Sequence, residues 1–156
     1  MHSDDSQAYT EKLAEMARNC ACFNFRKASR SVTQLFDLVL APTGLRSTQL
    51  VILITGELLG PSSIARVARE LVMDRSTLTR NLKPLLNTGL LAFSRSANAK
   101  QKSVAVTAAG REALLSALPY WEKAQRQLVA RAGTEHWGDL MTELANIVEA
   151  SRSASQ

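Results

Sequence analysis

The spacing of apolar residues along the chain predicts a mainly helical protein. Apolar positions recur every three or four residues between residues 8 and 40, which predicts one long N-terminal helix. A segment from residue 47 to 58 is apolar nearly all round, as expected of a buried central helix. Two shorter amphipathic segments, 64–71 and 75–87, predict a third and a fourth helix. Two longer helices are expected to follow in the last third of the chain.

A different pattern interrupts the helices after residue 89. Leu90–Arg95 and Lys102–Thr107 have the composition and alternation of short strands, and the polar stretch 96–101 connects them. The expected fold is therefore mainly α with a small β-hairpin, in one structural domain. Asp74 and Thr107 are the expected N-caps of the helices that follow them, and Gly89 is expected to end the fourth helix with a positive φ.

The fourth predicted helix, 75–87, has two contrasting faces. At about 100° of rotation per residue, its leucines cluster on one side. The other side carries hydroxyl, guanidinium, ammonium and amide groups, which bond phosphates and base edges. The short helix before it and a connection of three or four residues make a helix-turn-helix, and the hairpin after it forms a basic wing. The residues of this second side are Ser76, Arg80, Lys83 and Asn87, flanked by Thr77 and Thr79.

The net charge of +5 comes from the same part of the chain. Residues 62–102 hold eight basic and two acidic residues, whereas the rest holds 11 basic and 12 acidic ones. Together with the helix-turn-helix pattern, this favours a polyanionic partner, double-stranded DNA. A winged-helix module that binds proteins instead of DNA is the alternative.

Other classes of function find little support in the sequence. No paired carboxylates on one face, Ser/His/Asp set, glycine-rich phosphate loop or metal-ligand spacing is apparent, so neither an enzyme nor a cofactor is expected. No apolar run approaches the roughly 18 residues of a membrane span, and we expect a cytoplasmic protein without a membrane partner.

The order of the predicted elements resembles that of the MarR family of bacterial transcription regulators. The most specific pieces are IARVARELVMDRSTLTRNLKPLLNTGLLAFSRS, from Ile64 to Ser96, and VAVTAAG, from Val104 to Gly110. The resemblance implies a winged helix-turn-helix lobe at 45–107, flanked by N-terminal (1–44) and C-terminal (108–156) dimerisation helices. It also implies a homodimer on a pseudo-palindromic operator, usually a repressor, which a small aromatic or anionic effector releases.

The resemblance further implies which residues contact DNA. Four would enter the groove, two would lie near phosphates, and three would act from the wing. In the wing, Asn98 and Lys100 stand where the family usually has an Asp followed by Arg, and an ammonium cannot make the planar, forked contact of a guanidinium. The three groups are Ser76, Thr77, Thr79 and Arg80 in the groove, Arg75 and Lys83 near phosphates, and Arg95, Asn98 and Lys100 in the wing.

Two cysteines, Cys20 and Cys22, leave three interpretations open. They could be buried helix residues. Cys22 also stands eight residues before Arg30, a spacing that is similar to the hydroperoxide-sensing branch of the family, although Arg26 and Phe36 occupy the positions of that branch's two tyrosines. Thiol or peroxide sensing through Cys22 is therefore the second interpretation, and a metal site is the third.

Overall fold

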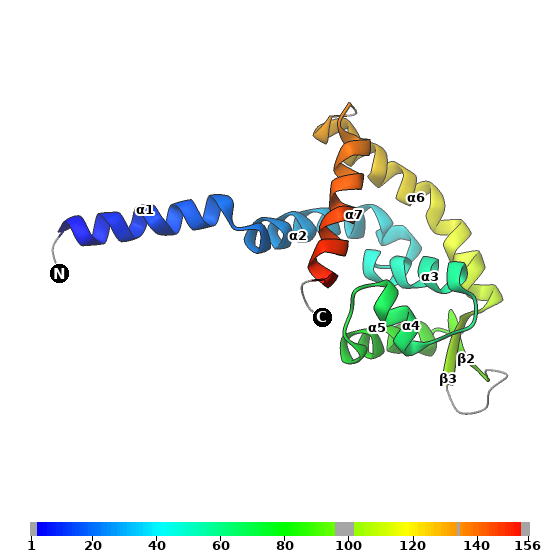
Figure 1. Cartoon of the computed structure of the whole chain (residues 1–156). Coiled ribbons are helices and arrows are strands. Elements are labelled where there is room, and N and C mark those ends of the chain that lie inside the picture. The colour runs from blue at the N-terminus through cyan, green and yellow to red at the C-terminus, as the bar shows by residue number, and fades with distance from the viewer. Residues whose placement is uncertain (1–2, 96–101, 134, 154–156) are drawn as a thin grey trace.

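The computed structural model describes residues 3–95, 102–133 and 135–153, and the chain is mainly helical, as predicted. Figure 1 shows a lobe formed by α3, α4, α5 and the β2–β3 hairpin, with α6 and α7 beside it and α1 extending away. The elements are α1 (Ser3–Asn19), α2 (Ala21–Leu40), the 3₁₀ turn η1 (Ala41–Thr43), α3 (Ser47–Leu59), β1 (Ser62–Ser63), α4 (Ile64–Glu70), α5 (Arg75–Asn87), β2 (Leu91–Arg95), β3 (Lys102–Val106), α6 (Ala108–Ala132) and α7 (Trp137–Ser153).

The core of the lobe forms around α3. Ile52 and Leu53 of this helix are almost fully buried, which confirms the predicted central helix. The leucine side of α5 packs into the same cluster through Leu78, Leu82 and Leu85. The apolar faces of the two helices therefore meet in one core, and this contact fixes which side of α5 is turned outward.

A three-stranded antiparallel sheet adjoins this core. The predicted hairpin is confirmed: β2 pairs with β3 from Leu91 opposite Val106 to Arg95 opposite Lys102. The sequence did not suggest the third strand, β1, which makes β3 the central strand. Ser63, opposite Ser103 in this ladder, is also the N-cap of α4, because its hydroxyl accepts a hydrogen bond from the amide of Arg66.

The N-terminal helix is broken, so the prediction of one continuous helix is wrong. Cys20 adopts an extended conformation (φ −71°, ψ 112°) between α1 and α2, with no glycine or proline at the break. The side-chain amide of Asn24 donates to the carbonyl oxygens of Ala17, Arg18 and Cys20 at 3.4, 3.0 and 3.0 Å. It bonds the carbonyl groups of Ala17 and Arg18 in the last turn of α1, and it shares the Cys20 carbonyl with the backbone amide of Asn24 itself.

The C-terminal helices agree with the prediction. Thr107 caps α6, because its hydroxyl accepts from the amide of Gly110 at 3.1 Å. The last helix, α7, begins at Trp137. Residues 151–153 continue this helix, and the Arg152 guanidinium donates to the Arg69 carbonyl at 2.7 Å.

Among the described residues, no single helix is long and apolar enough to cross a membrane. Only α2 with η1 and α3, taken together, reach the required length and composition, and they are bent by 78°.

Candidate nucleic-acid interface

The N-terminus of α5 is organised by Asp74, its N-cap. One carboxylate oxygen accepts from the Thr77 amide at 2.8 Å and from the Ser76 hydroxyl at 2.5 Å, while the other accepts from the Thr77 hydroxyl at 2.7 Å. The hydrogen bonds from the Ser76 hydroxyl and from Thr77 hold the pKa of Asp74 well below its usual range. The cap is therefore an ionised carboxylate near neutral pH, and the predicted cap is confirmed.

The polar face of α5, defined by Ser76, Thr79, Arg80, Lys83 and Asn87, is exposed. Half-buried Thr77 lies at its edge, where its hydroxyl oxygen accepts a hydrogen bond from the Arg80 guanidinium at 3.2 Å. The Thr79 hydroxyl donates to the carbonyl of Arg75 at 2.7 Å. On the opposite side Leu78, Leu82 and Leu85 are buried and Leu86 is half-buried, so the sequence predicted the orientation of the helix correctly.

Three cations lie on or beside this face: Arg75, Arg80 and Lys83. Within the described ranges, the ion pairs of the chain involve neither Arg75 nor Arg80 nor Lys83. Asp74 is the nearest acid in the sequence, and its two oxygens are occupied by hydroxyl and amide donors. The face therefore combines unpaired positive charge with hydrogen-bonding side chains, as a surface for an anionic ligand requires.

The structure describes the base of the wing and not its tip. Arg95 ends β2, where its backbone pairs with Lys102 at the start of β3. Asn98 and Lys100 lie outside the described residues, so their expected contacts stay predictions. The wing follows α5 directly through Gly89, whose φ of 72° confirms the predicted left-handed helix end.

The predicted dimerisation helices expose many large apolar side chains. Every described side chain of α1 from residue 6 onward is exposed, and α7 buries none. Trp121 is 38% exposed, and Trp137 is half-buried. Most of the exposed large apolar side chains among the described residues lie on α1, α2, α6 and α7. They include Tyr9, Leu13, Met16, Phe23, Leu38, Leu115, Leu118, Leu140, Met141, Ile147 and Val148.

Both cysteines are exposed in the single chain, so they are not buried within one chain as the first interpretation expected. Cys20 lies in the break between α1 and α2. Cys22 lies in the first turn of α2, where every side chain is exposed. Within the described part of the chain, no group of three or more His, Cys, Asp or Glu side chains could hold a metal ion. The metal interpretation thus gains no support from the geometry.

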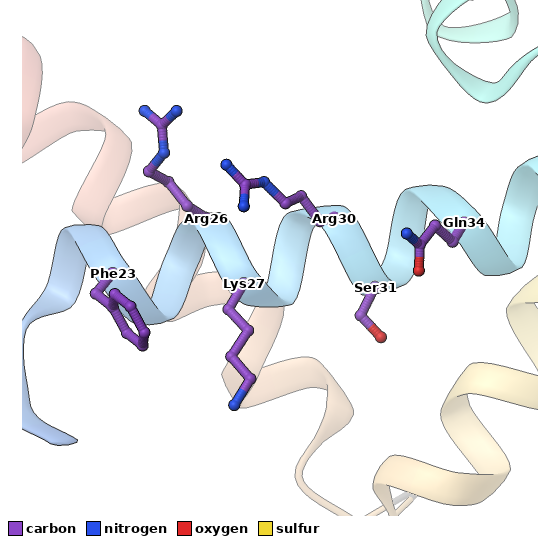
Figure 2. Close-up of a pocket in the computed structure, with 6 residues that line it drawn as sticks. All are labelled: Phe23, Arg26, Lys27, Arg30, Ser31 and Gln34. Carbon is purple, nitrogen blue, oxygen red and sulfur yellow. The ribbon is translucent and has the colours of Figure 1, made fainter. Parts of the chain in front are cut away.

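The exposed half of α2 also carries a shallow hollow of about 500 Å³. Arg26 and Arg30 extend together to one side of the helix, whereas Phe23, Lys27 and Ser31 extend to the other (Figure 2). Their functional groups do not converge on one point, so this surface does not form a ligand pocket in the single chain.

Comparison with known proteins identifies the family. No family model and no curated protein matches the sequence. The structure of the *M. tuberculosis* transcriptional regulator MosR in complex with DNA is 33% identical, and the match covers 88% of this chain and all of that one, with a TM-score of 0.79. The chain belongs to the MarR family. Within this family, α3 to β3 form the winged helix-turn-helix lobe.

Two further solved structures share the MarR-family fold at lower identity. The repressor CouR, bound to a 23-mer DNA duplex, is 21% identical, with 85% of this chain and 95% of that chain covered and a TM-score of 0.77. Apo MarR from *E. coli* is 16% identical, with 81% and 96% covered and a TM-score of 0.68. These two likenesses concern the fold alone.

Proposed function

We propose that this protein is a MarR-type DNA-binding transcription regulator. The observation that carries the proposal is the orientation of α5. Leu78, Leu82 and Leu85 are buried in the lobe, and the polar face is exposed, with cations that form no ion pair among the described residues. The family relation supports it, since MosR was crystallised in complex with DNA. An α-helix fits the major groove, where the arrangement of α5 would let side chains reach base edges.

The residues of this surface divide into two roles. Arg80 projects from the middle of the polar face, and a guanidinium pairs with the two acceptors of guanine. Arg75 and Lys83, at either end, would contact phosphates and set the position of the helix without reading sequence. The wing, with Arg95, Asn98 and Lys100, would contact the adjacent backbone or minor groove.

We infer that the regulator acts as a homodimer. Exposed apolar side chains on α1, α2, α6 and α7 give it a surface that association would bury. Two-fold symmetry would hold two copies of α5 about 34 Å apart, one turn of DNA, and would require a pseudo-palindromic operator.

We further propose a repressor that a small aromatic or anionic effector releases. A cleft of about 720 Å³ lies between α7 and the turn that precedes α5. It combines the apolar Val72, Ile147 and Val148 with the cationic Arg69 and Arg152. An effector that prefers one spacing of the two lobes would shift the dimer away from the spacing that fits the operator. Loss of operator affinity in the presence of benzoate or a related aromatic carboxylate would support this class of effector.

Two measurements test DNA binding. Fluorescence anisotropy with a duplex selected from a random library should show affinity that falls steeply with salt, because binding releases counterions. Arg80→Ala should abolish the preference for the selected duplex over random DNA. Lys100→Ala should weaken binding to both duplexes alike.

The matched control for Arg80→Ala is Arg126→Ala on α6, which removes an exposed arginine outside the lobe. It should leave both affinities unchanged. If no duplex binds selectively, or if Arg80→Ala and Arg126→Ala behave alike, the protein-interaction module becomes the better explanation.

A second candidate function, thiol sensing, is favoured by the position of the cysteines. Both are exposed, and Cys20 is not helical, so the poor geometry of a disulfide within one helix does not apply. A hydroperoxide would oxidise the Cys22 thiolate to a sulfenic acid and leave as an alcohol or water. The Cys20 thiol would then attack that sulfur, form the disulfide and release water.

Peroxide should lower the operator affinity of the wild type and leave Cys22→Ser bound. Cys20→Ser serves as the companion variant, because it can form the sulfenic acid and not the disulfide. An identical peroxide response of the wild type and Cys22→Ser would exclude Cys22 as the sensor.

A further inference from the structure

The hydroxyl groups of α5 have a fixed hydrogen-bond direction. Ser76 and Thr77 donate to the carboxylate of Asp74, and Thr79 donates to the carbonyl of Arg75. An ionised carboxylate and a carbonyl can only accept, so each of the three hydroxyl protons is committed inside the helix. What these hydroxyls present outward is therefore their oxygen lone pairs.

This direction limits what the hydroxyls can bind. A lone pair cannot bond a phosphate oxygen, guanine O6 or N7, or thymine O4, since all of these are acceptors. It can accept from an exocyclic amino group, which in the major groove means adenine N6 or cytosine N4. The donors on the same surface come from the cations Arg75, Arg80 and Lys83, which suit phosphates and guanine.

Ser76 is best placed of the three hydroxyls to use this property. It is exposed in the first turn of α5, four residues before Arg80 and seven before Lys83, so all three lie on one side of the helix. Thr77 is half-buried, and one of its lone pairs already accepts from Arg80. The Asp74 carboxylate, held at the helix N-terminus by the Thr77 amide, keeps the Ser76 proton turned inward.

We propose that Ser76 is a specificity-determining residue that accepts a hydrogen bond from the amino group of an adenine or a cytosine in the major groove. Asp74 is its positioning residue, because it fixes the direction of the hydroxyl. The inference rests on the proposed function, since it names the base chemistry that this DNA-binding surface selects. The expected half-site places an amino-bearing base beside a guanine that Arg80 contacts.

The test uses the full-length protein and a duplex selected from a random library. Each adenine of the half-site is replaced in turn by purine, and each cytosine by 2-pyrimidinone, which removes only the amino group. At one position the wild type should lose about fivefold in affinity, as for one neutral hydrogen bond. Whether purine or 2-pyrimidinone causes the loss distinguishes adenine from cytosine. Ser76→Ala should bind the parent and the substituted duplex equally.

Asp74→Asn tests the positioning role. Asparagine is also a good N-cap, so α5 should persist, and its amide can donate to the hydroxyl and release the Ser76 proton outward. Selection with this variant should move the preferred base at the Ser76 position toward guanine or thymine, whose major-groove edges carry carbonyl acceptors. Asp139→Asn in the first turn of α7 is the matched control, and it should select the wild-type sequence.

Two results would overturn the inference. If removal of the amino group costs Ser76→Ala as much as the wild type at every position, Ser76 does not read an amino group. If Asp74→Asn selects the same base as the wild type, Asp74 does not set the hydroxyl direction. A selected sequence without this amino dependence refutes the inference alone, whereas the absence of any selected sequence refutes the proposed function with it.

Discussion

At Gly110, α6 packs tightly against the base of the hairpin, and Gly110→Ala tests how much the fold depends on this contact. A Cβ atom at this position would overlap with the carbonyl oxygen of Leu90 and would lie 2.7 Å from a methyl carbon of Val106. The oxygen cannot move aside freely, because it accepts hydrogen bonds from the amide and the hydroxyl of Thr107, at 3.1 and 3.2 Å. The helix or the base of the wing must therefore shift.

The size of the effect follows from two opposing contributions. Insertion of a carbon into a packed site costs about 1–3 kcal/mol, and the rigid backbone neighbour places this case near the upper end. Alanine regains about 1 kcal/mol over glycine through its helix propensity. The net loss of about 2 kcal/mol in the free energy of unfolding should lower the Tm by about 4–8 °C in a chain of this length.

Thermal unfolding followed by circular dichroism measures this change, at one protein concentration because dimerisation would shift the Tm. Gly138→Ala in α7 is the matched control, since its Cβ would meet no atom within 4 Å. It should leave the Tm unchanged or raise it slightly. A Tm of Gly110→Ala within about 1 °C of the wild type would refute the reasoning, because it would mean that the close approach costs nothing.

Four further substitutions have defined outcomes. Val72 has a φ of 52°, which costs a β-branched residue about 1–2 kcal/mol. Val72→Gly should therefore raise the Tm by about 2 °C, despite the entropy cost of glycine. A lower Tm would contradict this. Because its pKa is lowered in the folded protein, ionised Asp74 stabilises the fold above the unfolded pKa of about 4, and this contribution is lost as the pH falls. Asp74→Asn should therefore make the urea midpoint of unfolding depend less on pH on the acid side. An unchanged dependence on pH would count against this. Leu82→Ala should cost about 2–5 kcal/mol in urea unfolding, because the side chain is fully buried. Arg111→Ala breaks a half-exposed ion pair with Glu57 and should cost less than about 1 kcal/mol in the same measurement. Similar losses for the two variants would contradict at least one of these estimates.

Much of the lobe could be predicted because its signals are local. Asp74 and Thr107 are the N-caps that the sequence predicted, and their carboxylate and hydroxyl groups accept from amides three residues later. The leucine spacing of α5 follows from the helical period alone, so the identity of its exposed face could be read before any tertiary contact was known. The same is true of the hairpin, because apolar and small polar residues alternate along its second strand.

The features that were missed depend on contacts that spacing does not encode. The break at Cys20 contains neither glycine nor proline, and it is supported by a side-chain amide that lies four residues later, at Asn24. The strand β1 has only two residues, and it exists because β3 lies beside it. The exposure of the cysteines could not be predicted from an apolar helix pattern, since that pattern does not show whether a neighbour covers the helix.

Ser63 performs two tasks at once: its backbone belongs to the ladder with β3, and its hydroxyl begins α4. Ser63 thereby connects the base of the wing to α4, the first helix of the helix-turn-helix. A hinge at that junction would have to break a strand pair and a helix cap together. In the proposed dimer, adaptation to operators of different groove width would therefore come from rotation of the whole lobe as one unit, and not from movement of the wing relative to α4.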